Sequence, residues 1–189
     1  KKHFQMSIPV FRKAYSNVAC ENKIIKQPDC SIKRIKEFKV AYLKFERTHR
    51  NKQAYSTLWK QIMEFAKEYN LTDKGFKYVS ISLDSLDITE IDKCRFLIGV
   101  TVPYSMEIPK GFGTLNIRAG LYSVFNIKGN YQELNKIYRN IYLDWLPNSK
   151  YRLREQMTFE LYANTPDKTS TEELVTEIYL PIEAKQKIK

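Results

Sequence analysis

The chain has 189 residues, 43% of them hydrophobic, and a formal net charge of +11 at pH 7. This composition supports a folded core and argues against a disordered chain, and the length suits one domain with or without an appendage. The longest apolar runs, such as residues 96–102, are too short to cross a bilayer, and the first residues do not form an apolar signal segment. We therefore expect a cytoplasmic protein without a membrane partner.

Cysteine and histidine are too few for a disulfide framework or a structural zinc site. The three cysteines, Cys20, Cys30 and Cys94, have no Cys-x-x-Cys spacing and are odd in number. The only histidines are His3 and His49. These counts favour a reduced cytosol, and we expect neither a metal nor another cofactor.

Positive charge is concentrated near the N-terminus. Residues 1–39 carry ten Lys or Arg against three acids, a net +7, which leaves only +4 for the other 150 residues. Any contact with a polyanion is therefore expected at the N-terminal end, although a solvated basic linker explains the pattern equally well.

Residues 1–30 are expected to form an appendage rather than part of the main fold. Ser7 can cap a short helix in which Phe11, Tyr15 and Val18 follow at helical spacing. Residues 20–30 are polar, contain Pro28 and show no sustained period, so they are expected to be a linker.

The main domain, residues 31–182, is expected to begin with a strand, a helix and two further strands. Residues 32–45 alternate as an extended segment, residues 52–69 carry an apolar helical stripe, and residues 76–83 and 95–102 have strand patterns. Residues 183–189 are expected to be a tail.

A second unit repeats this order. Residues 117–127 are extended and broken at Gly120, and Asn130 with Glu133 has the spacing of a capping box. The helix that follows is expected to end at Pro147, and residues 157–164 and 173–181 are expected to be strands.

The two units can be aligned, with residues 35–45 matching 117–127 and residues 84–89 matching 164–169. The predicted fold is α+β: a duplicated strand-helix-strand-strand unit forming an antiparallel sheet, with two helices on one side and a ligand groove on the other. The alignment pairs Ser80 with Glu160, so the acid occurs only in the second copy.

The predicted site centres on Glu160, because a carboxylate inside a strand is costly to bury without a partner. Phe159 and Leu161 point to one face of this strand, and Thr158, Glu160 and Tyr162 to the other. We expect an aromatic pocket for a small organic cation; a water-facing Glu160 is the equally weighted alternative. The predicted ligand-binding residues are Glu160, Tyr162, Trp145, Tyr142, Tyr122, Tyr179, Tyr42 and Phe96.

Other chemical motifs are weaker. Gly111-Phe-Gly113 lacks a following helix and is best explained as a turn. No Ser, Cys and His combination suggests a nucleophilic triad, so no catalytic residue is predicted. Trp59 and Tyr69 are assigned to the core or surface rather than to the pocket.

Seven segments in order resemble the GyrI-like effector-binding domain. They are Phe38-Lys39-Val40-Ala41-Tyr42, Asp87-Ile88-Thr89, Cys94-Arg95-Phe96 with Thr101-Val102-Pro103, Gly120-Leu121-Tyr122-Ser123-Val124-Phe125, Trp145-Leu146-Pro147-Asn148-Ser149, Phe159-Glu160-Leu161-Tyr162 and Glu177-Ile178-Tyr179-Leu180-Pro181-Ile182. The resemblance implies a small-molecule sensor, often fused to an AraC- or MerR-type DNA-binding domain. Glu160 matches the pocket glutamate that binds lipophilic cations in multidrug-sensing members.

The resemblance also implies two alternatives, because some stand-alone relatives inhibit DNA gyrase and others hydrolyse cyclopropane-bearing compounds with an acid beside an aromatic. Residues 1–12 resemble the closing segment of an AraC/XylS helix-turn-helix domain, although Gln5 and Ile8 depart from that pattern. Residues 1–19 are thus interpreted as the remnant of a DNA-binding domain that lies mostly upstream. The leading hypothesis is a non-enzymatic effector domain of a transcription regulator; a homodimer and the identity of the effector stay open.

Overall fold

The computed structural model describes residues 29–46, 54–83 and 95–185, and the structural statements below concern these ranges. The predicted N-terminal helices and most of the predicted linker lie outside them. Within these ranges, no helix is both long and apolar enough to span a bilayer.

The first unit contains β1 (Asp29–Ile35), β2 (Phe38–Glu46), α2 (Ala54–Glu68), β3 (Tyr78–Ser82) and β4 (Arg95–Val102). The predicted extended segment 32–45 is therefore two strands rather than one. β1 also begins two residues before the predicted start of the main domain. Strand β4 has the predicted bounds.

The second unit begins with β5 (Gly113–Ile117) and β6 (Gly120–Lys128), separated at the predicted break. A 3₁₀ turn η2 (Tyr131–Glu133), α3 (Leu134–Asn140), a π-helical segment η3 (Ile141–Trp145) and α4 (Leu146–Asn148) then form one continuous helical stretch. β7 (Tyr151–Leu153), β8 (Phe159–Tyr162), a 3₁₀ turn η4 (Thr171–Glu173) and β9 (Val175–Ala184) complete it.

The ends of this second helical stretch differ from the sequence prediction. Glu133 makes no side-chain cap, and its carboxylate accepts hydrogen bonds from Lys136 instead. Pro147 lies within the last turn rather than ending it. The π-type bond from the Leu146 N–H to the Ile141 carbonyl widens the preceding turn, which relieves the clash that proline causes in a regular helix.

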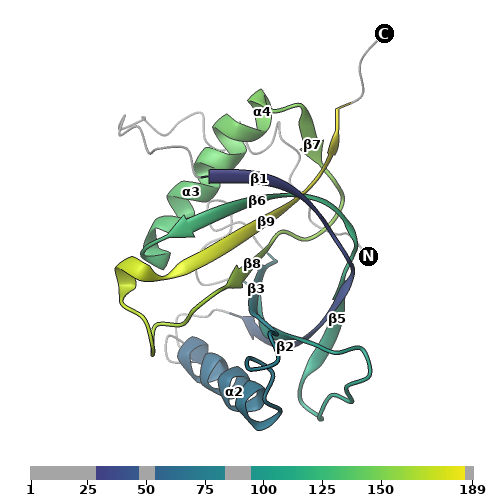
Figure 1. Cartoon of the computed structure of the whole chain (residues 1–189), viewed down its shortest axis with the longest axis vertical. Coiled ribbons are helices and arrows are strands. Elements are labelled where there is room, and N and C mark those ends of the chain that lie inside the picture. Colours follow the sequence, from purple (N-terminus) through teal and green to yellow (C-terminus); the bar gives the residue numbers. More distant parts are fainter. Residues whose placement is uncertain (1–28, 47–53, 84–94, 186–189) are drawn as a thin grey trace.

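The strands form one nine-stranded antiparallel sheet in the order β1-β6-β9-β8-β3-β4-β2-β5, with β7 paired to β9 (Figure 1). This order is symmetric about its centre, because each strand of one unit has its counterpart at the mirrored position. At the central β3–β8 pair, Ser80 lies directly opposite Glu160. The duplication aligned these same two residues, so a pseudo-twofold axis passes through this pair.

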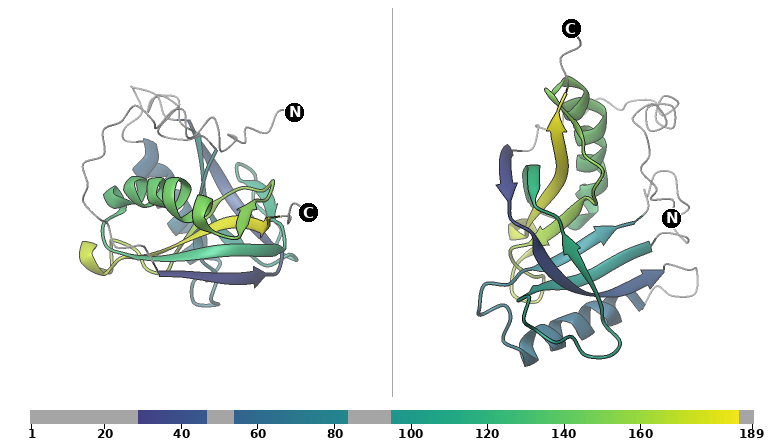
Figure 2. Two further views of the ribbon diagram at one scale, coloured as in Figure 1. Left: turned by 90° about the horizontal axis from the view of Figure 1, so that it is seen from above. Right: turned by 90° about the vertical axis from the view of Figure 1, so that its right-hand side faces the viewer.

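Both helices cover the same face of the sheet. Ala41, Ile98 and Val100 pack with α2, whereas Phe125 and Ile178 pack with α3. Cross-strand registers place all of these side chains on one face. Figures 1 and 2 show the helices at opposite ends of this face, with β8 and β3 between them.

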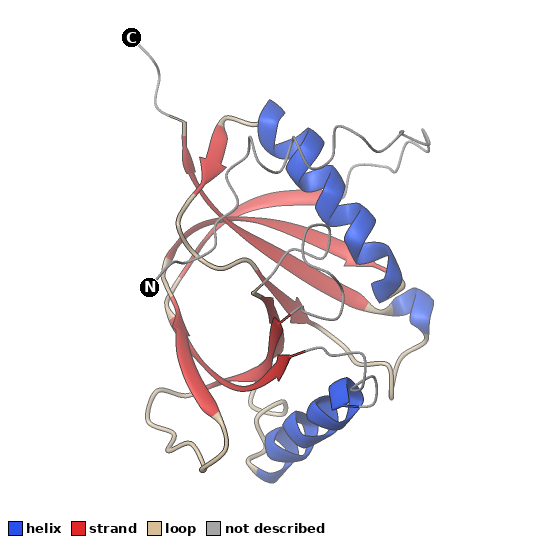
Figure 3. Cartoon of the chain, turned by 180° about the vertical axis from the view of Figure 1, so that it is seen from behind, coloured by secondary structure: helices blue, strands red, loops and turns tan. Residues whose placement is uncertain are grey.

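The sheet curls around a second core on its other face (Figure 3). Phe38 of β2 contacts Phe159 of β8 with ring centroids 5.6 Å apart, although two strands separate β2 from β8 in the sheet order. Buried Val40, Val79 and Tyr122 fill the concave side. The antiparallel α+β fold is as predicted, but Glu160 does not lie in a groove on this side. Its register with Ile178 places it on the helix-covered face.

Candidate functional site

Glu160 lies at the centre of the sheet, between the areas that α2 and α3 cover. Its two carboxylate oxygens each accept one hydrogen bond from a tyrosine. The Tyr138 hydroxyl of α3 donates to Oε1 over 2.9 Å, and the Tyr162 hydroxyl of the same strand donates to Oε2 over 2.6 Å. Glu160 and Tyr162 are two positions apart on β8, and alternate residues of a strand share a face, which explains the second bond.

The surroundings of Glu160 disfavour its charged form. Burial raises its pKa above the ordinary value, and the hydrogen bonds from Tyr162 and Tyr138 lower it by a smaller amount. Part of its surface stays accessible although protein atoms surround it closely. Burial, followed by the charge of Glu160, also holds the pKa of Tyr138 well above its usual range, so this hydroxyl stays protonated as a donor.

Aromatic rings from several elements pack against the two tyrosines that bond to this acid. Trp59 of α2 and Tyr131 of η2 each meet the Tyr162 ring edge-on, with centroids 5.4 Å apart. Tyr142 stacks against Tyr138 at 6.4 Å. The arrangement combines one carboxylate, donated hydroxyls and several ring faces, which suits an organic cation. In the described ranges, no group of three or more His, Cys, Asp or Glu could hold a metal ion.

Three of the eight predicted site residues lie together: Glu160, Tyr162 and Tyr142. The Tyr142 hydroxyl is 3.4 Å from that of Thr158, two residues before Glu160. Trp145 instead packs edge-on against Phe125, 5.0 Å between centroids, in the core beneath α3.

The other predicted residues lie elsewhere. Phe96 stacks on Phe45 in the core beneath α2. Tyr122, Tyr179 and Tyr42 belong to the core on the opposite face. The sequence predicts Tyr122 and Tyr179 at the site because their segments neighbour that of Glu160, but the parity of their strands points them to the other face.

These three tyrosines have structural partners on that face. The fully buried Tyr122 donates to the Arg118 carbonyl and has the Arg154 guanidinium over its ring. Tyr42 lies opposite Gly99 and Gly113, and a Cβ at position 113 would come within 2.4 Å of its ring. Tyr42 therefore covers the space left by glycine on neighbouring strands.

Tyr179 forms a second glutamate–tyrosine pair. Its hydroxyl donates to Glu177 over 3.1 Å, and its ring stacks on Phe159 at 4.7 Å. Glu177 also pairs with Lys33 at 3.5 Å. The same Glu-x-Tyr spacing thus occurs on adjacent strands but opposite faces. Within the described ranges, an ion pair with lysine is formed by Glu177 and not by Glu160.

Sequence reasoning missed Tyr138 and Tyr131 and assigned Trp59 outside the pocket. One signal was available: Tyr131, Tyr138, Tyr142 and Trp145 are seven, four and three residues apart, the spacing of one helical stripe. Trp59 had no such signal, because α2 and β8 are far apart in the sequence.

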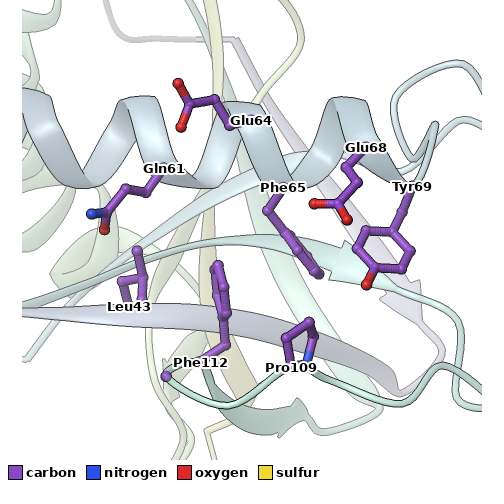
Figure 4. Close-up of a pocket in the computed structure, with 9 residues that line it drawn as sticks. Leu43, Gln61, Glu64, Phe65, Glu68, Tyr69, Pro109 and Phe112 are labelled. Carbon is purple, nitrogen blue, oxygen red and sulfur yellow. The ribbon is translucent and has the colours of Figure 1, made fainter.

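A separate groove of about 540 Å³ lies on another flank of α2 (Figure 4). Gln61, Phe65, Glu68 and Tyr69 line its helix side, and Leu43 and the loop carrying Pro109 and Phe112 line the other. None of the eight predicted site residues lines it. Its carboxylates are exposed, so it lacks the enclosed acid that distinguishes the Glu160 site.

Solved structures share this fold. The EcmrR C-terminal domain is 18% identical with a TM-score of 0.68, over 84% of this chain and 99% of that one. EcmrR in a DNA complex is 17% identical with a TM-score of 0.65, over 87% of this chain, and the match spans only 61% of that longer chain. SAV2435 bound to tetraphenylphosphonium is 18% identical with a TM-score of 0.54, over 82% of this chain and 94% of that one. A hydrolase from Listeria innocua is 10% identical with a TM-score of 0.56, over 92% of this chain and 98% of that one.

At these identities the likeness shows the fold. No curated protein matches the chain. The family model for the GyrI-like small molecule binding domain matches residues 28–183, which include every strand and helix described above except the end of β9. The chain therefore belongs to the GyrI-like family of small-molecule-binding domains.

Proposed function

We propose that the Glu160 site binds a lipophilic organic cation and that the chain is the effector-sensing part of a transcription regulator. The observation that carries this is the tyrosine-held carboxylate of Glu160 inside an aromatic enclosure. Within the described ranges, no Lys or Arg forms an ion pair with it. A positively charged ligand would supply the missing counter-charge.

The energetics favour a cation over a neutral ligand of the same shape. Each cation–π contact contributes roughly 0.5–2 kcal/mol, more when the ring and cation are dehydrated. Attraction to a carboxylate is also stronger in a partly buried site than in water. A lipophilic cation is cheaper to dehydrate than a small ammonium ion, so rings and charge can act together.

Two relatives agree with the proposal. SAV2435 was solved with tetraphenylphosphonium, a lipophilic cation. EcmrR was solved in a complex with DNA, and the present chain matches only 61% of the EcmrR chain in that complex. The resemblance of residues 1–12 to an AraC/XylS helix-turn-helix supports assignment to the AraC/XylS class of transcription regulators. DNA would then be contacted mainly by residues upstream of Lys1.

The test is titration calorimetry with tetraphenylphosphonium and neutral triphenylphosphine oxide. Glu160→Gln should weaken binding of the cation by a factor of about a hundred or more, since stranding one charge of a buried pair costs about 3–5 kcal/mol. The neutral ligand should change little. Glu177→Gln is the matched control, because it removes the acid from the other Glu-x-Tyr pair and should leave both affinities unchanged. Equal losses for the two ligands in Glu160→Gln would contradict the proposal.

A hydrolase is the second candidate. The Listeria relative has that activity in its name, and Glu160 has a raised pKa beside two tyrosine hydroxyls, as suits a general acid. Turnover of a cyclopropane-bearing substrate that is lost in Glu160→Gln but kept in Glu177→Gln would favour the enzyme. A gyrase-inhibiting interaction domain has no separate support in the described structure.

A further inference from the structure

Ser80 lies beside Glu160 at the pseudo-twofold axis. The two residues are direct partners in the antiparallel β3–β8 pair. Side chains in such pairs share a face, with Cβ atoms about 4.5–5.5 Å apart. The Ser80 and Glu160 side chains thus leave neighbouring strands side by side, on the face that the two helices cover.

The Ser80 side chain is mostly buried, but its hydroxyl still reaches solvent. It is 6% exposed, and its hydroxyl has no hydrogen-bond partner in the described part of the chain. Ser123, fully buried on the same face, shows the usual arrangement, because its hydroxyl donates to the Leu180 carbonyl.

The packing around Ser80 does not require a polar residue. On its other side, Ser80 is paired with Ile98, a fully buried apolar residue of the core beneath α2. An alanine would fit the same position. A solvent-accessible hydroxyl that no protein group occupies, directly opposite the proposed ligand-binding acid, is placed to bond with a ligand.

We propose that Ser80 is a ligand-contacting residue and that the effector is an organic cation carrying a hydrogen-bonding oxygen about one strand spacing, roughly 5 Å, from its charged centre. The cation pairs with Glu160, and the oxygen bonds to the Ser80 hydroxyl. This rests on the proposed function of the Glu160 site and narrows its ligand class beyond lipophilic cations.

The test compares phenyltrimethylammonium with (3-hydroxyphenyl)trimethylammonium by calorimetry on the full chain. The wild type should bind the hydroxylated cation about fivefold to tenfold more tightly, the effect of one net hydrogen bond. Ser80→Ala should abolish this preference and leave the affinity for the parent cation within about twofold. Ser123→Ala is the matched control and should keep the preference, because its hydroxyl is already bonded within the protein.

The two proposals fail in different ways. Equal affinities for the two cations in the wild type, or an unchanged preference in Ser80→Ala, would overturn the role of Ser80. Glu160→Gln reports separately on the charge: if it weakens neither cation, the proposed function fails. Binding of neither cation to the wild type would overturn both.

Discussion

The contribution of Glu160 to stability should be less favourable at neutral pH, where the acid is charged, than at low pH. Burial raises the pKa of this acid above its unfolded value, so the stability gained from the neutral form is complete below the unfolded pKa. It is lost as pH rises through the folded pKa. Relative to Glu160→Gln, we therefore expect the wild-type free energy of unfolding to fall from about pH 4 upward. Urea unfolding of both proteins at several pH values measures this; a constant difference would contradict it.

The hydroxyls of Tyr162 and Tyr138 should stabilise the protein because they donate to a carboxylate. Hydrogen bonds to charged groups contribute about 1.5–3 kcal/mol, so Tyr162→Phe and Tyr138→Phe should each lower the free energy of unfolding by that order at pH 7. The larger loss is expected for Tyr162, whose bond is the shorter at 2.6 Å against 2.9 Å.

A double-mutant cycle separates this effect from simple packing. In the Glu160→Gln background the carboxylate is absent, so each tyrosine substitution should cost clearly less than in the wild type. Equal costs in the two backgrounds would show that the rings, and not their bonds to Glu160, carry the stability. Unfolding in urea at one pH gives all four values of each cycle.

At the scale of elements, we expect one of the two tryptophans to affect ligand binding and the other to affect stability. Trp59 of α2 contacts Tyr162, whereas Trp145 of η3 packs on Phe125 in the core beneath α3. Trp59→Leu should therefore lower the affinity for tetraphenylphosphonium by about three- to thirtyfold if one or two cation–π contacts are lost. Trp145→Leu should lower the melting temperature and leave the affinity nearly unchanged. The opposite result would restore Trp145 to the site.

The sequence predicted the elements better than their mutual placement. Alternation predicts which side chains of β8 share a face, and Phe159 and Leu161 do lie on the face of β8 that points away from Glu160. Alternation does not say which face the helices cover, so Tyr122 and Tyr179 were grouped with an acid that they do not meet. Tyr138 was missed because a helical aromatic facing a core and one facing a carboxylate have the same spacing.

At the scale of the whole molecule, the site lies where the two units meet. The scaffold is symmetric about the Ser80–Glu160 pair, but only the second unit supplies the acid. Trp59 comes from the first unit, and Tyr138 and Tyr142 come from the second. A ligand held by these residues would contact both units and stabilise them together, since binding to the folded state alone raises its stability.

The charge distribution leads to a last prediction, about DNA. Ten Lys or Arg among residues 1–39 give that end a net +7, enough to attract phosphates. Phosphate contacts supply affinity without reading bases, so this chain should bind duplexes of different sequence equally and weakly. Because bound phosphates release counterions, the logarithm of the affinity should fall with the logarithm of salt with a slope of about −0.9 for each phosphate contacted. Fluorescence anisotropy with two unrelated duplexes over a salt series measures both properties, and tight, salt-resistant, sequence-selective binding would mean that the chain reads DNA bases itself.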